Sequence, residues 1–196
     1  MALKNYRFLT KPLKIIFWFL IFSGSFNLVN LILIAFHQYT AHLLNIYTVI
    51  EFFFLSLYYS YLNVKKYRNL MYMAIVIFTI LCIVNYLFVQ NKIEFNTYTR
   101  PVGAIVIIFY SLMYVSQQNN EEQNWGDNMY NWINTGILLY LASSLFMFIF
   151  INYLLNAGQH INRILWATHD TILILEYLLF AVGFYKCKTH QTISTY

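Results

Sequence analysis

Residues 164–185 read ILWATHDTILILEYLLFAVGFY, an apolar stretch of membrane-spanning length that nevertheless contains ionisable side chains. These are His169, Asp170 and Glu176. About 20 apolar residues in helical form cross the hydrocarbon core of a bilayer, so the stretch predicts a membrane-spanning helix. A charge near mid-bilayer costs roughly 2.5–3.5 kcal/mol on insertion scales. We therefore expect these side chains to face the inside of a helix bundle rather than lipid.

A second stretch repeats this pattern. Residues 46–62 read IYTVIEFFFLSLYYSYL and place Glu51 among apolar and aromatic neighbours. One interpretation of Glu51 is a neutral carboxylic acid that donates a hydrogen bond, because burial favours the uncharged form. The other is a proton-titrating group or a cation ligand, oriented by Tyr47 four residues earlier on the same helical face.

The composition places the chain among membrane proteins. Of its 196 residues, 60% are hydrophobic, 20% aromatic and only 10% charged, whereas soluble domains carry about 25% charged residues. We expect an all-α polytopic membrane bundle, a single transmembrane domain over 1–196 in contact with the lipid bilayer. Six apolar runs predict its spans: roughly 13–36, 41–62, 70–89, 101–116, 131–154 and 161–185.

The basic residues predict the orientation of these spans and argue against nucleic-acid binding. The net charge of +5 comes from lysines and arginines that flank the apolar runs. Four lie in the N-terminal arm, three in the 63–69 loop and two in the tail, and the loops on the alternate side hold only two. Cytoplasmic loops of membrane proteins are enriched in Lys and Arg. Both termini are therefore predicted to be cytoplasmic, in a bacterial inner membrane.

Heptad spacing adds a second feature to the last span. Asn162, His169, Glu176 and Gly183 recur every seven residues and share one helical face, with Trp166 beside it. The stripe is either a helix–helix seam, in which polar side chains hydrogen-bond and glycine permits close approach, or the wall of a solvated pocket or ion path. Small and polar residues of the first and fifth spans, such as Asn27, Asn30 and Ser144, are open to the same two interpretations.

Depth along the helices suggests which ionisable groups meet. At about 1.5 Å per residue, Glu51 lies roughly 15 Å from the outer end of its span, and His169 about 12–14 Å from the outer end of the last one. The sequence thus predicts one interior ligand or proton site around Glu51, His169 and Glu176. Asp170 is turned about 100° from His169 along the helix and is expected to serve another purpose.

Motifs for metal or cofactor chemistry are not found. His37, His42 and His160 lie toward the predicted outer side, but no HExxH, HxxxH or Cys/His cluster occurs. We therefore predict no metal, no cofactor and no enzyme activity. A metal-dependent intramembrane hydrolase using His and Asp remains a remote alternative.

Several strings resemble a group of bacterial multi-pass inner-membrane proteins with no assigned activity: LTKPLKIIFWFLIF from Leu9, NIYTVIEFFFLSLYYSYL from Asn45, EFNTYTRP from Glu94, NWINTGILLYLASSLFMFI from Asn131 and ILWATHDTILILEYLLFAVGFYK from Ile164. The resemblance implies a six- or seven-span bundle, with one further span before the point where this chain begins. It also implies retained residues that match Glu51, Tyr98–Arg100, Trp166 and His169.

The resemblance directs attention to Arg100, which directly precedes Pro101 at the predicted outer mouth of the fourth span. Arg100 either snorkels to the membrane interface, or forms a lid that pairs with Glu94 or an anionic ligand.

Three functions are compatible with these patterns. The first is a small ligand- or signal-sensing bundle, whose output passes to a cytosolic or membrane signalling partner through the basic tail or the 117–130 loop. The second is a proton-coupled small-molecule transporter, although no inverted repeat or broken helix pair is recognisable. The third is the metal-dependent hydrolase.

Overall fold

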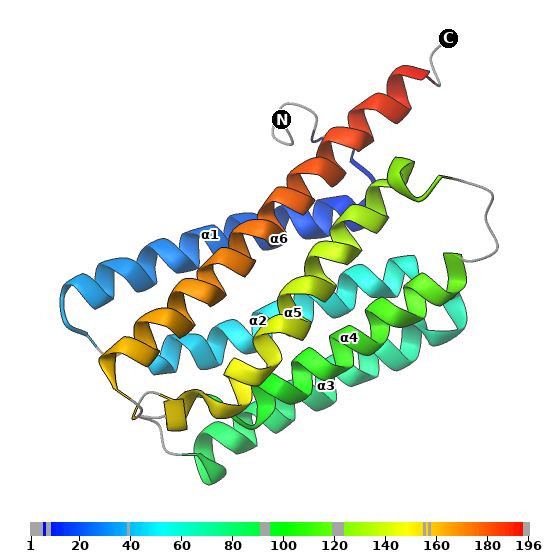
Figure 1. The fold of residues 1–196 in the computed structure, drawn as a ribbon. Coiled ribbons are helices and arrows are strands. Elements are labelled where there is room, and N and C mark those ends of the chain that lie inside the picture. Colours follow the sequence, from blue (N-terminus) through cyan, green and yellow to red (C-terminus); the bar gives the residue numbers. More distant parts are fainter. Residues whose placement is uncertain are drawn as a thin grey trace.

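The described part of the chain consists of helices and their connections. The computed structural model describes residues 6, 9–38, 40–90, 95–118, 124–154, 156 and 158–193, with side chains up to residue 187. Within these ranges there is no strand, and the fold is an all-α bundle. Its main helices are α1 (Lys11–Ala35), α2 (Ala41–Leu62), α3 (Arg68–Val84), α4 (Thr99–Gln118), α5 (Met129–Leu154) and α6 (Gln159–Ile193), as Figure 1 shows.

The predicted all-α bundle of about six membrane-length helices is confirmed. Six helical segments of the described chain are long and apolar enough to cross a membrane. The third includes a short 3-10 helix (Lys65–Tyr67) before α3 and a π-helical turn (Asn85–Val89) after it. The fourth begins at Thr99, with Pro101 in the first turn, where its missing N–H removes no intrahelical hydrogen bond.

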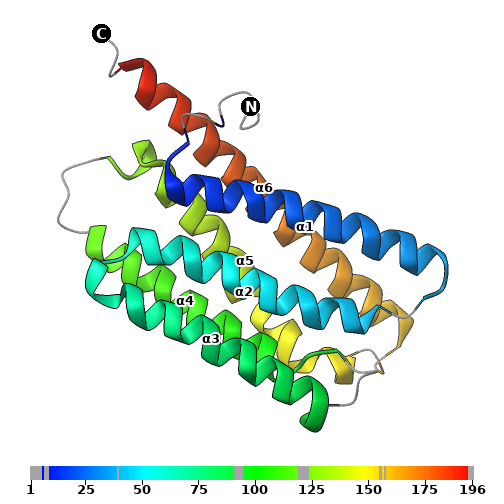
Figure 2. The ribbon, with the colours of Figure 1, turned by 180° about the vertical axis from the view of Figure 1, so that it is seen from behind.

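The helices are arranged around α2 and α5. Helix α2 packs against α1, α3 and α4. Helix α4 also packs against α5, and α5 packs against α6 along much of its length. The start of α1 and the end of α6 lie at one end of the bundle (Figures 1 and 2). We call this the terminal end; the α1–α2 and α5–α6 connections lie at the opposite end, the loop end.

Close packing of α5 and α6 characterises the terminal end. A Cβ added at Gly183 would lie 2.8 Å from Ile133 Cγ1 and 2.9 Å from the Met129 carbonyl oxygen. At Gly136 it would lie 3.0 Å from the Phe180 ring. The heptad stripe of the last span therefore follows α5 here as a helix–helix seam, in which glycines let the two backbones approach.

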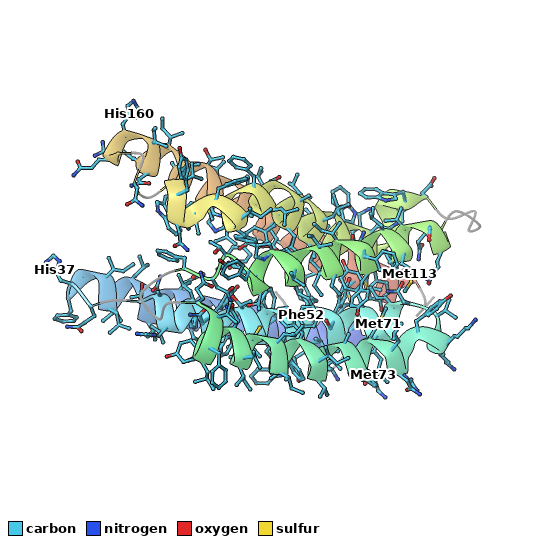
Figure 3. All side chains as sticks on the ribbon, turned by 90° about the horizontal axis from the view of Figure 1, so that it is seen from below. His37, Phe52, Met71, Met73, Met113 and His160 are labelled. Atoms are coloured by element: carbon cyan, nitrogen blue, oxygen red, sulfur yellow. The ribbon has the colours of Figure 1, made fainter. Side chains whose placement is uncertain are left out.

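The loop end is more open. Helices α1 and α6 diverge toward it (Figures 1 and 2), and most of their side chains there are exposed. Figure 3 shows His37, which follows α1, and His160, at the start of α6, on separate sides of this end. The divergence of α1 and α6 creates the space in which the candidate site lies.

Candidate functional site

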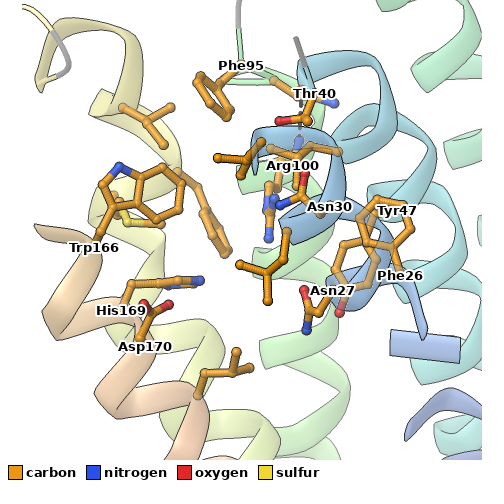
Figure 4. A pocket seen from close by; sticks show the side chains of 18 of the residues that line it. Phe26, Asn27, Asn30, Thr40, Tyr47, Phe95, Arg100, Trp166, His169 and Asp170 are labelled. Atoms are coloured by element: carbon orange, nitrogen blue, oxygen red, sulfur yellow. Dashed lines mark hydrogen bonds between the residues drawn. The ribbon is translucent and has the colours of Figure 1, made fainter. Parts of the chain in front are cut away.

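A cavity of about 550 Å³ lies between α1 and α6 at the loop end. Figure 4 shows side chains of α6 on one wall and side chains of α1, α2 and α4 on the other. The walls are mainly aromatic and aliphatic, with a few polar groups among them. The polar and charged lining residues are Asn27, Asn30, Thr40, Tyr47, Asn96, Arg100, Tyr140, His169 and Asp170.

Arg100 is the cation of this cavity. Its guanidinium carbon lies 4.2 Å from the centre of the Phe148 ring and 5.9 Å from that of Tyr47, within the range of cation–π attraction. The Tyr140 hydroxyl is a further polar contact. The Arg100 Nε is buried and has no hydrogen-bond partner. The side chain therefore points into the bundle and does not snorkel to the interface.

The start of α4 fixes the backbone of Arg100. The Asn96 side-chain oxygen accepts hydrogen bonds from the backbone N–H groups of Thr99 (2.9 Å) and Arg100 (3.2 Å). The Asn96 amide also donates to the Thr99 hydroxyl at 2.6 Å. These bonds satisfy amide groups that a helix N-terminus otherwise leaves without partners. Arg100 is thus held on a capped first turn.

Two asparagines of α1 face the same cavity. Asn27 and Asn30 are three residues apart, so they share one face of the helix, and Figure 4 shows both on the Arg100 side of the cavity. The Asn30 side-chain oxygen is buried without a hydrogen-bond partner. One turn earlier, the Ser23 hydroxyl forms hydrogen bonds with the hydroxyls of Tyr47 (3.0 Å) and Tyr177 (3.2 Å). These bonds link α1 to α2 and α6.

His169 forms part of the opposite wall. Its Nδ1 lies 3.2 Å from the Ser144 hydroxyl of α5, and its ring packs against those of Tyr140 and Trp166. The next residue, Asp170, also lines the cavity, although its side chain is exposed. The two residues are therefore neighbours around one space, and the separate purpose expected for Asp170 stays a prediction.

Glu51 is placed behind Arg100 rather than in the main cavity. It lines a separate void of about 10 Å³, close to the space that one water molecule needs. Arg100 and Phe148 line both the void and the cavity and so separate them. Glu51 and Arg100 interact electrostatically, but no direct ion pair joins these two described residues.

Glu176 lies deeper in the seam between α5 and α6. Its side chain is buried, and its backbone oxygen faces Gly136 of α5. Glu176 is close enough to Glu51 and Tyr140 to interact with both electrostatically, but it does not line the cavity. The predicted trio is thus divided: His169 lies at the cavity, and Glu51 and Glu176 lie behind its wall.

The remaining predicted residues fall into two groups. Tyr47 and Trp166 line the main cavity together with Arg100. Asn162 lines a separate void of about 10 Å³ with Trp166. The predicted pairing of Arg100 with Glu94 concerns a residue outside the described ranges.

Three residues that line the cavity were not predicted from the sequence: Tyr140, Phe148 and Asn96. Asn27 and Asn30 had a usable signal, because two asparagines three residues apart in an apolar span share one face. No comparable pattern identified Tyr140 or Phe148, because α5 contains many other aromatic and aliphatic residues.

The described residues contain no group of three His, Cys, Asp or Glu side chains arranged to hold a metal ion. His42 instead lies 3.2 Å from the Tyr86 hydroxyl. Comparisons with protein-family models, with curated proteins and with solved structures found no match for this chain. The functional argument therefore rests on the cavity itself.

Proposed function

We propose that the protein is a small-ligand-binding, sensor-like bundle of the bacterial inner membrane, and that the cavity between α1 and α6 is its ligand site. The observation that carries this proposal is the pair of unsatisfied polar atoms, Arg100 Nε and Asn30 Oδ1, on residues that line a cavity of about 550 Å³. A buried polar group without a partner costs about 1–3 kcal/mol. Both atoms are closed to solvent in this structure, so the side chains of Arg100 and Asn30 must adjust for a ligand to supply the missing partners and gain that free energy on binding.

The size and the lining of the cavity support the same function. Small-molecule sites are typically about 300–1,000 Å³, mainly apolar, with a few placed polar groups. Arg100 supplies a positive charge and Asn30 supplies a side-chain amide. His169 supplies an imidazole ring, which is positioned by the Ser144 hydroxyl. Five helices contribute lining residues. Ligand binding can therefore alter how several helices pack.

Membrane orientation and output belong to the same proposal. The basic residues favour cytoplasmic termini, which puts the loop end and its cavity toward the outer side. Helix α6 then leads from the cavity to the cytoplasmic side, where Lys186 forms a 3.0 Å ion pair with Asp127 before α5. A signalling partner that contacts this region would receive the output. Kinship with the bacterial multi-pass group, on the strings quoted above, is part of this proposal.

Thermal unfolding of the purified protein in a maltoside detergent tests ligand binding. A panel of amino acids, sugars, nucleosides, fatty acids and amphiphilic amines is added at graded concentrations. A ligand that binds only the folded state stabilises it by about 2.7 kcal/mol at 100 times its Kd. We expect at least one compound class to raise the unfolding temperature in a saturable way.

Matched variants show whether that effect arises in the cavity. Asn30→Trp fills the cavity and is expected to abolish the stabilisation. Ile32→Trp is the control, because Ile32 is on the same helix, is exposed and does not line the cavity. Equal stabilisation of both variants would place binding elsewhere and refute the proposal.

A second candidate function, a proton-coupled carrier, is favoured by a polar route that continues past the cavity. Electrostatic interactions link Arg100 to Glu51, Glu51 to Glu176 and Glu176 to Tyr59. Tyr59 donates to Asn134 at 2.7 Å, in the direction of the terminal end. Ligand-driven proton uptake in liposomes loaded with a pH dye tests this function. Uptake that is lost in a folded Glu51→Gln variant would favour the carrier over the sensor.

A further inference from the structure

We infer that the ligand is a zwitterion with an apolar body, whose acidic group binds Arg100 and whose ammonium group faces Asp170 across the cavity. This inference rests on the proposed function and specifies its ligand class. Arg100 and Asp170 both line the cavity and project from opposite walls (Figure 4).

The surroundings of Arg100 leave room for an acidic group. A guanidinium offers five N–H donors in a planar fork that matches a carboxylate or phosphate. Two flanks of this guanidinium are covered by the rings of Phe148 and Tyr47, which accept no strong hydrogen bond. The Nε has no partner, and Glu51 attracts the cation only from the far side of the cavity wall. The Tyr140 hydroxyl also contacts the guanidinium, and an acidic ligand group in the cavity can accept from the N–H groups that remain.

The surroundings of Asp170 point to a cation. This carboxylate lies within an apolar span, where an uncompensated charge is costly. Within the described part of the chain, no hydrogen bond or ion pair reaches it. Trp166 is four residues earlier on the same helical face and also lines the cavity. Its indole ring is the best aromatic surface for an ammonium group.

An ion of a single sign fits this cavity poorly. A simple anion would pair with Arg100 and be repelled by Asp170, and a simple cation would meet the opposite arrangement. Like charges placed together cost free energy and exclude wrong partners. A zwitterion satisfies both walls at once.

The apolar body follows from the remaining lining and from the opening. Leu31 and Ile34 of α1 line the cavity and are nevertheless 63% and 52% exposed. The cavity therefore opens along an apolar face of a membrane-spanning helix. On the other wall, Met147, Ile151 and Leu173 line the cavity with aliphatic surface. An alkyl chain bound between them can reach the bilayer between α1 and α6.

Four probes with matched alkyl chains test this inference on the full chain in maltoside detergent. They are 2-aminododecanoate (zwitterion), laurate (acid), dodecylamine (amine) and dodecanol (neutral). Binding is followed by thermal shift and by the fluorescence change of Trp166, with Trp166→Phe as the blank. We expect the zwitterion to bind at least about tenfold more tightly than each of the others, because one satisfied charged hydrogen bond is worth about that factor.

Two substitutions separate the two charges. Arg100→Gln should weaken the zwitterion and laurate by about tenfold or more and leave dodecylamine unaffected or tighter. Asp170→Asn should weaken the zwitterion and dodecylamine and leave laurate unaffected or tighter. If Arg100→Gln does not fold, the double variant Glu51→Gln/Arg100→Gln removes the buried charges together and replaces it.

Free phenylalanine, added without a detergent-like chain, distinguishes the source of the ligand. If it competes with 2-aminododecanoate and depends on Arg100 and Asp170, the same zwitterion chemistry is supplied from the aqueous side. If only the long-chain probe binds, the bilayer is the source. Either result supports the zwitterion site.

Two results would overturn the inference in distinguishable ways. Equal binding of laurate and 2-aminododecanoate, with no effect of Asp170→Asn, refutes the zwitterion but leaves a ligand-binding cavity. If none of the four probes binds, while another compound stabilises the wild type and Ile32→Trp but not Asn30→Trp, only the ligand class is refuted. If no compound at all stabilises the protein, the proposed function fails as well.

Discussion

The two ends of α6 pack in opposite ways, although they belong to one continuous helix. Toward the terminal end, α6 lies so close to α5 that Gly183 has no room for a methyl group. Toward the loop end, it borders a cavity of about 550 Å³ shared with α1. The contrast predicts that stability depends mainly on the terminal end of α6, and that the proposed ligand binding depends on its loop end. Four substitutions, in order of decreasing expected effect, test this separation.

Gly183→Ala should cause the largest loss of stability. The added Cβ would meet Ile133 at 2.8 Å and the Met129 carbonyl oxygen at 2.9 Å, and overpacking of this kind costs about 2–3 kcal/mol. The measurement is the free energy of unfolding in mixed maltoside–SDS micelles. Gly24→Ala is the control, because no atom lies within 4 Å of its added Cβ. Equal effects would show that α5 and α6 are not tightly packed.

Glu51→Leu tests the boundary between the two regions. Removing the carboxylate leaves the Arg100 charge without its nearby anion, and charged neighbours couple by about 2 kcal/mol in such networks. A double-mutant cycle with Arg100→Leu measures this coupling in the same micelles. We expect the double variant to be more stable than the sum of the single variants predicts. An unaltered stability of Glu51→Leu would instead mark Glu51 as a tolerated seam residue.

Tyr59→Phe should have a smaller effect at the tightly packed end. The Tyr59 hydroxyl donates a 2.7 Å hydrogen bond to Asn134 of α5, and hydrogen bonds between membrane helices contribute roughly 0.6–1.7 kcal/mol. We expect a loss of about 1 kcal/mol in SDS unfolding. Tyr61→Phe is the matched control, since Tyr61 is exposed on the same helix. A loss that is no larger than in this control would contradict the assigned bond.

Asn27→Leu should have the smallest effect on stability. Asn27 lines the cavity, is only partly buried and has a polar contact with Tyr177, and a hydrogen bond of this kind between membrane helices contributes about 0.6 kcal/mol on average. Asn27→Leu should instead weaken ligand binding, which is measured with the probe that stabilises the wild type. A large loss of stability without any change in binding would show that the loop end is packed as firmly as the terminal end.

The fold was largely predictable because it depends on local properties of the chain. Apolar length alone predicted α2 to its bounds, Ala41–Leu62. Heptad spacing predicted that Glu176 and Gly183 share one face of α6, as either a seam or a pocket wall, and the structure packs Gly183 of that face against α5. These properties are carried by residues close together in sequence.

The site was less predictable because it depends on how distant helices pair. The sequence indicated His169, Trp166, Tyr47 and Arg100, which the structure places around one cavity. It did not indicate that Arg100 stands between this cavity and Glu51, since that order depends on the packing of α2, α4 and α5. For the same reason, the sequence could not distinguish Tyr140 and Phe148 from the other aromatic residues of α5.

The length of α6 has a mechanical consequence. The helix runs unbroken over 35 residues, about 50 Å at 1.5 Å per residue. Its tight contact with α5 at Gly183 lies nearer to one end of the helix than to the other. A rigid helix that tilts about this contact moves its two ends in opposite directions, and the longer arm, which includes Trp166 and Asp170, moves further. A small shift at the tail thus corresponds to a larger change in the width of the cavity.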